Sequence, residues 1–348
     1  MFVNRSSGSA SAGPRPSAPF HDPAFDLGFV VGIPLVALAS GAVVVAIPAA
    51  FPIVLALDIW FLGYHHVIST FIRLLGDPVT RRESVMLWTG LPVLVVVGVV
   101  AMAALFGTWA LATTYFYWQW WHYTRQSRGI AMLIDRGTSA KPDGGSRLFE
   151  VVFYALPIAG VLSRSADGPT DFIGTPFRPV PIPEWVADAS TVVAVALTAV
   201  AVVMVARRVL SGTASSLAAQ YMGSHVVVFA VSYLLIDDIT HGWLVVNIWH
   251  NAQYVAFVWL FHHRKAGATS SARSPLPIPH RLARSLTVFL AVGLVLSTLV
   301  YGLVAAALMV AAVPAIIVYQ AINFHHYVVD SRIWQSRRPS MGEPSVAR

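Results

Sequence analysis

Long apolar runs, separated by short polar segments, cover the chain from about residue 27 to residue 330. Each run is close to the length of about 20 residues that an α-helix needs to cross a bilayer. The pattern predicts an all-α protein, a polytopic integral membrane bundle of about ten transmembrane helices arranged in repeated hairpins. The expected helices cover residues 27–48, 52–75, 84–106, 109–132, 148–163, 186–206, 216–236, 241–264, 284–302 and 306–330.

The segments on either side of this hydrophobic region differ from it in composition. Residues 1–26 are rich in Ser, Ala, Gly and Pro, which is typical of a disordered tail, and residues 331–348 form a basic tail. No convincing cleavage site precedes the first apolar run, so we expect no removable signal peptide. The chain is therefore divided into a tail (1–26), a transmembrane domain (27–330) and a second tail (331–348).

Basic residues gather after the second, fourth, sixth, eighth and tenth expected helices. Because cytoplasmic loops carry an excess of Lys and Arg, this places both termini in the cytoplasm, in a bacterial-type inner membrane. The net charge of +7 is distributed over these short connections rather than over one face. We therefore expect membrane lipids as partners and no nucleic acid.

The composition limits the chemistry that is available. Only 11% of the residues are charged and 56% are hydrophobic, whereas a soluble protein carries roughly 25% charge. Cysteine is absent, which excludes disulfides, thiolate metal sites, iron–sulfur clusters and cysteine nucleophiles. Any metal must be bound through nitrogen or oxygen.

One pattern occurs four times, each time in the second helix of an expected hairpin. The copies are GYHH at 63–66, QWWH at 119–122, NIWH at 247–250 and NFHH at 323–326. Their last residues are His66, His122, His250 and His326. Polar groups are costly in hydrocarbon and mark function there, and imidazole is the commonest ligand of transition metals. The repeat predicts a metal or haem site, and the alternative is a set of histidines that hydrogen-bond between packed helices.

Further polar side chains flank these histidines on the same helix face. Positions three before and four after a helical residue share its face. The upstream amides are Gln119, Asn247 and Asn323, and the downstream groups are Thr70, Gln126, Tyr254 and Asp330. We expect the four amides, Gln126 included, to orient the cofactor or its ligands. Asp330 and Tyr254 are the expected catalytic groups.

The remaining histidines are more ambiguous. His65 and His325 precede repeat histidines and lie about 100° around the helix from them. They are either ligands of a second metal or face a neighbouring helix. His225 either donates a ligand or pairs with nearby polar groups, His262 has an expected interfacial role, and His280 falls in a polar segment. The Pro-rich connection 164–185 is either a cap over a cavity or a plain linker.

The spacing of His326 and Asp330, His-x-x-x-Asp, and the arrangement of single histidines on separate helices resemble the Brp/Blh family of membrane carotenoid dioxygenases. The resemblance implies cleavage of β-carotene to retinal by histidine-bound iron. The other repeats carry Thr70, Gln126 and Tyr254 at the position of the aspartate, which puts substrate and chemistry in doubt.

The residues themselves favour a membrane metalloenzyme. The first hypothesis is a non-haem iron oxygenase that acts on a lipid-soluble substrate, such as a carotenoid, a sterol or a similar lipid, with an unidentified electron donor. The second is an electron-transfer protein that carries haem b, and copper is a further alternative metal. The third is a transporter or metal-ion permease, in which the histidines bind transiently.

Overall fold

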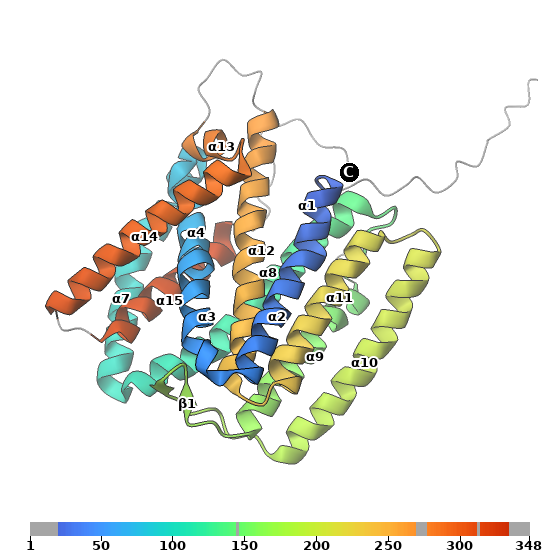
Figure 1. The fold of residues 1–348 in the computed structure, drawn as a ribbon, viewed down its shortest axis with the longest axis horizontal. Helices are drawn as coiled ribbons and strands as arrows, with labels where there is room; N and C mark the ends of the chain where they lie inside the picture. The colour runs from blue at the N-terminus through green and yellow to red at the C-terminus, as the bar shows by residue number, and fades with distance from the viewer. Residues whose placement is uncertain (1–19, 144–145, 269–276, 312–313, 334–348) are drawn as a thin grey trace, which may run out of the picture.

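The computed structural model describes residues 20–143, 146–268, 277–311 and 314–333, and helices dominate it (Figure 1). The α-helices are α1 (Pro23–Leu27), α2 (Ile33–Ala46), α3 (Phe51–Asp58), α4 (Tyr64–Gly76), α5 (Pro78–Glu83), α6 (Val85–Trp88), α7 (Gly90–Phe106), α8 (Thr108–Thr138), α9 (Arg147–Ala166), α10 (Glu184–Leu210), α11 (Ser216–Ala230), α12 (Ile239–Ala268), α13 (Ile278–Leu282), α14 (Leu286–Ala311) and α15 (Ala315–Ile333). The prediction of an all-α bundle is confirmed.

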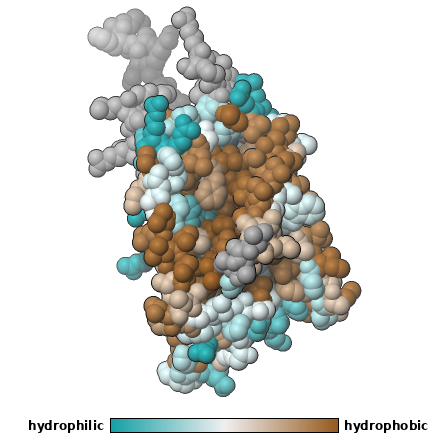
Figure 2. Space-filling view, turned by 90° about the vertical axis from the view of Figure 1, so that its left-hand side faces the viewer, coloured by the Kyte–Doolittle hydropathy of each residue, from teal (hydrophilic) through white to brown (hydrophobic). Residues whose placement is uncertain are grey.

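Six continuous helical segments are long and apolar enough to cross a membrane. They are Pro23–Ala46, Pro48–Gly76, Arg147–Ala166, Glu184–Leu210, Ser216–Leu235 and Leu286–Met309, and Gly90–Phe106 is a shorter apolar helix. Figure 2 shows a broad hydrophobic band on one face of the molecule, with more hydrophilic residues toward both ends. The chain thus has the character of a multi-pass membrane protein, with six helices among the described residues that meet this length and hydropathy, and the predicted total of about ten spans is not confirmed.

Three of the predicted helices contain short segments of wider π-helix. These are η1 (Gly28–Gly32), η3 (Ile59–Gly63) and η4 (Val231–Leu235), and a turn of 3-10 helix, η2 (Pro48–Ala50), opens the second span. A π segment inserts extra chain into a helix and rotates the faces on either side relative to each other. Because η3 ends directly before α4, it changes which residues of the first part of this span share a face with His66.

The boundary between the last two predicted helices, at 303–305, is wrong. α14 continues to Ala311, and α15 begins at Ala315, directly after Pro314. Proline has no amide hydrogen to continue a helix but is favourable at a helix start, which explains the position of the break. The connection 164–185 contains a small antiparallel hairpin, β1 (Asp171–Phe172) and β2 (Thr175–Pro176). We refer to that end of the bundle as the hairpin end.

The last residues of the predicted N-terminal tail are ordered. The carboxylate of Asp26 accepts the backbone N–H of Phe20 at 2.8 Å and that of His21 at 3.0 Å. The ring of Phe20 is buried, and the guanidinium of Arg264 lies over it. Residues 20–26 therefore pack on the end of α12, while 1–19 and 334–348 of the predicted tails lie outside the described residues.

α12 lies in the middle of the bundle, between α4 on one side and α2 and α11 on the other (Figure 1). Its side chains Leu244, Val245 and Trp249 are completely buried. α8 and α15 also contact α12 or one another, so the four helices that carry the repeat are neighbours. A central helix that is covered by others has no need of the uniform apolarity that lipid-facing helices require.

We expect Gly242→Ala to destabilise the protein by about 1–3 kcal/mol, as overpacking does elsewhere. A methyl group at Gly242 in α12 would lie 2.0 Å from the backbone oxygen of Ser232 in η4, which is part of the main chain and cannot rotate away. Gly223→Ala is the matched control, because nothing lies within 4 Å of the added atom in α11. Thermal unfolding in detergent measures both; equal midpoints would contradict the close approach of α12 and η4.

Candidate metal centre

The four repeat histidines meet at one place in the bundle. His66 comes from α4, His122 from α8, His250 from α12 and His326 from α15, and all four are buried. The ring centre of His66 is 4.6 Å from that of His326 and 4.8 Å from that of His250. The ring centre of His122 lies 5.0 Å from that of His250 and 5.1 Å from that of His326. The convergence that the sequence left open is therefore present.

The ring nitrogens have the spacing and surroundings of a metal site. His66, His122 and His326 each offer one nitrogen within 4.8 Å of the others, and the Nε2 atoms of His66 and His326 are 2.7 Å apart. Two nitrogens bound at about 2.1 Å to one metal, at right angles, lie about 3 Å apart. The ring of His250 lies beside this triad rather than within it.

Several nitrogens of the cluster have no hydrogen-bond partner among the described residues. They are His66 Nδ1, His122 Nε2, His250 Nε2 and His326 Nδ1. Buried polar atoms are paired in at least about 90% of cases, and each unpaired one requires an explanation. A cation that accepts the Nε2 lone pairs of His122 and His250 supplies that explanation for two of the four atoms, so the donor set fits a metal with nitrogen ligands. If His66 and His326 bind the same cation through the Nε2 atoms that approach each other, their Nδ1 atoms stay without a partner among the described residues.

Three of the four downstream groups form one hydrogen-bonded chain at the side of the cluster away from the hairpin end. The hydroxyl of Tyr254 donates to Oδ1 of Asp330 at 2.5 Å and lies 2.7 Å from Oγ1 of Thr70. The ring of Tyr254 packs on that of His66, with 4.2 Å between their centres. Gln126 is not part of this chain, and its Oε1 is buried without a partner among the described residues.

A second polar network lies on the hairpin side of the cluster. Asn247 donates through Nδ2 to Oδ2 of Asp58 at 2.5 Å and accepts the hydroxyl of Tyr123 at 2.5 Å. Gln119 accepts the indole N–H of Trp243 at 2.7 Å. The ring of Tyr123 lies on that of His250, 4.0 Å away, so the network supports the fourth histidine.

Sequence reasoning did not find Asp58, Tyr123 and Trp243 as members of this network. The signal for Asp58 was its position as one of the few carboxylates inside a predicted span. Tyr123 and Trp243 lie among many aromatic residues, and the sequence does not distinguish them from interfacial ones. Asn323, in contrast, lines the cavity described below without a hydrogen bond in the described part of the chain.

His65 and His325 do not join the cluster. His65 packs on α14, where an added methyl group at Gly293 would lie 2.1 Å from its Nε2. His325 is 2.7 Å through Nε2 from the backbone oxygen of Leu87, and its ring stacks on that of Phe71. Of the two alternatives for these residues, the structure has the one in which they face neighbouring helices.

The other histidines have partners outside the cluster. His225 lies 3.0 Å from Oγ of Ser127 and 3.1 Å from the backbone oxygen of Phe153, so it pairs rather than joining the centre. His262 is fully buried and lies 2.9 Å from His280, Nδ1 to Nδ1, because α13 covers this part of α12. The interfacial role expected for His262 stays a prediction, and its side chain is covered by α13. Burial lowers the pKa of His280, which favours neutral imidazole in this pair.

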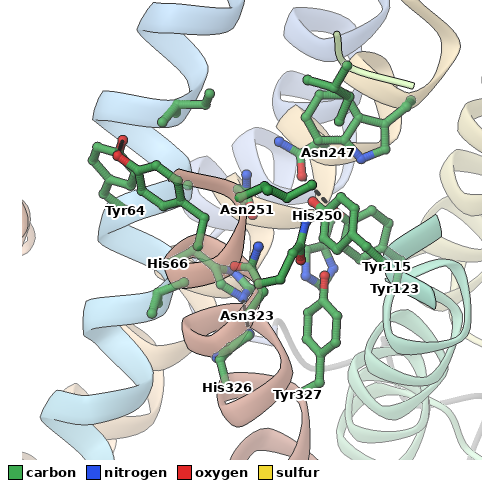
Figure 3. Close-up of a pocket in the computed structure, with 18 of the residues that line it drawn as sticks. Tyr64, His66, Tyr115, Tyr123, Asn247, His250, Asn251, Asn323, His326 and Tyr327 are labelled. Carbon is green, nitrogen blue, oxygen red and sulfur yellow. Dashed lines mark hydrogen bonds between the residues drawn. The ribbon is translucent and has the colours of Figure 1, made fainter. Parts of the chain in front are cut away.

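A cavity of about 270 Å³ adjoins the histidines (Figure 3). His66, His250 and His326 form part of its wall, and aromatic and amide side chains form most of the rest. Phe172, which belongs to β1, also lines it, together with Ile173 and Thr175. The connection 164–185 therefore caps the cavity rather than serving as a plain linker.

This arrangement combines buried nitrogen ligands, two polar networks that support them and an adjoining cavity for a small reactant. Comparison with known proteins adds no assignment to it. The chain matches no protein-family model, no curated protein and no solved structure.

Proposed function

We propose that the protein is a membrane-embedded oxygenase that binds non-haem iron through His66, His122 and His326, with His250 as a fourth ligand. The observation that carries the proposal is the convergence of four buried imidazole rings, three of which each offer a nitrogen within 4.8 Å of the others. Cysteine is absent, so no thiolate takes part, and the group of candidate ligands that converges among the described residues consists of imidazoles. Bound iron with open coordination positions would supply activation of dioxygen at this place.

The protein's own side chains have distinct tasks in this proposal. Tyr254 and Asp330, the expected catalytic groups, do not line the cavity; they hold the ring of His66 in place through packing and their shared hydrogen bond. Asn247 fixes Tyr123, whose ring limits the movement of His250. The aromatic cavity wall excludes water and orients the substrate. Gln119 and Asn323 remain candidates for positioning, and Gln126 has no contact that supports such a role.

The membrane arrangement extends this proposal. Four further spans would complete the ten and enclose the histidines within the bilayer. One consists of α6 and α7 together, and the others are α8, α12 and α15. Both termini would lie in the cytoplasm of an inner membrane, as the basic connections favour. A lipid-soluble substrate would then reach the cavity from the membrane. The resemblance to Brp/Blh dioxygenases supports this class of reaction.

The alternatives have less support. A haem would have to lie between paired imidazoles, whereas the rings of His66 and His326 contact each other directly. A transporter needs a path through the bundle, and on the side away from the hairpin end the chain of Thr70, Tyr254 and Asp330 covers the histidines.

Metal analysis and the visible spectrum of the purified protein test the proposal. After anaerobic reconstitution with Fe(II), we expect about one iron per chain and no Soret band, since the ligands are imidazoles without a porphyrin. Copper in place of iron would retain the centre but contradict its identity. A Soret band, or well-folded protein that binds no metal, would contradict the proposal itself.

A further inference from the structure

The cavity beside the histidines has an uncharged and strongly aromatic wall. None of the described residues that line it is Lys, Arg, Asp or Glu. Its amide side chains are Asn247, Asn251, Asn323 and Gln320, and its aromatic side chains are Tyr64, Tyr115, Tyr123, Phe172, Trp243, Tyr301, Tyr319 and Tyr327. In the metal-free protein an anion would lose its hydration here without gaining a cationic partner. The lining therefore selects an uncharged ligand that can form hydrogen bonds.

The volume limits how much of a ligand the cavity encloses. An engineered cavity of about 150 Å³ holds one benzene molecule in another protein. By this scale the 270 Å³ found here holds about eleven non-hydrogen atoms. A carotenoid, a sterol or a diacyl lipid is several times larger, so only one end of such a molecule can lie inside. The rest must leave through the wall.

Gln320 supplies an unused hydrogen-bonding group in this wall. Its side chain is 7% exposed, and its Oε1 has no partner among the described residues. It lies six residues before His326 on α15, which corresponds to about 9 Å along the helix. A ligand oxygen at Gln320 would thus lie within reach of the histidines through a single ring or short chain.

Three tyrosines close the cavity toward the lipid-facing side of the bundle. The rings of Tyr64 in α4 and Tyr301 in α14 stack with 3.6 Å between their centres, and the hydroxyls of Tyr64 and Tyr319 are 3.2 Å apart. Next to this wall α14 exposes apolar side chains, among them Leu299 and Leu303. Rotation of one or two tyrosines would connect the cavity with the bilayer.

We propose that the cavity binds the uncharged, oxygen-bearing ring end of a lipid, with Gln320 as hydrogen-bond partner. The apolar tail leaves between α4, α14 and α15, past Tyr64, Tyr301 and Tyr319. The inference specifies the substrate class of the proposed oxygenase and in that sense rests on the proposed function. Binding itself needs neither iron nor dioxygen, so the two proposals can fail separately.

The test uses the absence of native cysteine. Val67 lines the cavity from α4, and in Val67→Cys every labelled thiol reports on this place. The variant is placed in phosphatidylcholine nanodiscs without metal, and the rate of labelling by N-cyclohexylmaleimide is measured by mass spectrometry. The competitors are 4-decylphenol, decylbenzene and 4-decylbenzoate, which share a ring and tail but differ in polarity and charge.

We expect 4-decylphenol to protect the thiol at about tenfold lower concentration than decylbenzene, because one hydrogen bond strengthens binding by about this factor. We expect 4-decylbenzoate not to protect the thiol. When Gln320→Leu is added to Val67→Cys, the protecting concentrations of 4-decylphenol and decylbenzene should differ by no more than about twofold, because the hydrogen bond is lost. Gln253→Leu is the control, a buried glutamine outside the cavity wall, and should preserve the difference. Protection by the benzoate, or a difference that persists in Gln320→Leu, would overturn the ligand class.

The same variant tests the route of entry. Tyr64→Phe keeps the stacked ring but removes the hydroxyl contact with Tyr319, so labelling by the lipid-soluble maleimide should accelerate several-fold. Tyr221→Phe removes a buried tyrosine hydroxyl that donates to Oε1 of Gln253, outside the cavity wall, and should leave the rate unchanged. A membrane-impermeant sulfonated reagent should react slowly in every case. Equally fast labelling by that reagent would overturn entry from the bilayer and place the opening at the hairpin end.

Discussion

His66→Ala and His326→Ala are each expected to lower the affinity for iron by at least about 100-fold, since even changes outside the ligand set cost 10–100-fold. Their Nε2 atoms are the closest pair in the cluster, and each variant removes a nitrogen that the remaining histidines cannot replace. Equilibrium titration with Fe(II), followed by metal analysis of the separated protein, measures the loss.

The preceding residue provides a matched control in both cases. His65 and His325 are also buried histidines, but they face Gly293 and the backbone oxygen of Leu87 rather than the cluster. We expect His65→Ala and His325→Ala to retain iron at the wild-type level. Equal loss from the control variants, with unfolding midpoints unchanged, would place the metal elsewhere or show that it binds without the cluster.

Asn247→Leu is expected to destabilise the protein by about 2–4 kcal/mol. An interhelical hydrogen bond in a membrane bundle contributes about 0.6 kcal/mol on average, but a buried carboxyl group that loses its partner costs considerably more. Here the substitution removes the donor to Asp58 and the acceptor of the Tyr123 hydroxyl. Unfolding in mixed micelles measures the free energy, and iron affinity should also fall because Tyr123 no longer holds His250.

Asn323→Leu is the control for this effect, because Asn323 has the equivalent position in the repeat. It lines the cavity without a hydrogen bond to the described residues, so we expect a change within about 0.5 kcal/mol, as for sites without special interactions. If both variants lost the same stability, the network around Asp58 would not be the cause.

Repeated spacing in the sequence predicted much of the centre. One histidine in the second helix of each hairpin, within a repeated pattern, led to the expectation of a common site for His66, His122, His250 and His326. The downstream positions were equally informative, since Thr70, Tyr254 and Asp330 meet in one chain of hydrogen bonds. Helical periodicity is a local property, so residues that share a face could be identified without knowledge of the fold.

The sequence does not show which of two neighbouring histidines faces the cluster. The sequence treats His65 and His66, or His325 and His326, almost alike, because both members of a pair lie in an apolar helix. Which member faces the cluster depends on the rotation of the helix against its neighbours. In α4 that rotation follows the π segment Ile59–Gly63, which hydrophobic periodicity did not reveal.

Hydrophobicity and spacing alone determined that the chain is a helical membrane protein with the repeated histidine pattern in four of its helices, because bilayer thickness and helix pitch act on each segment separately. Tertiary structure decided which polar groups became partners. Asp58 and Asn247 are 189 residues apart in the chain, and the Pro-rich connection that caps the cavity could not be distinguished from a plain linker by its sequence. Such contacts follow from the packing of whole helices, which no single segment encodes.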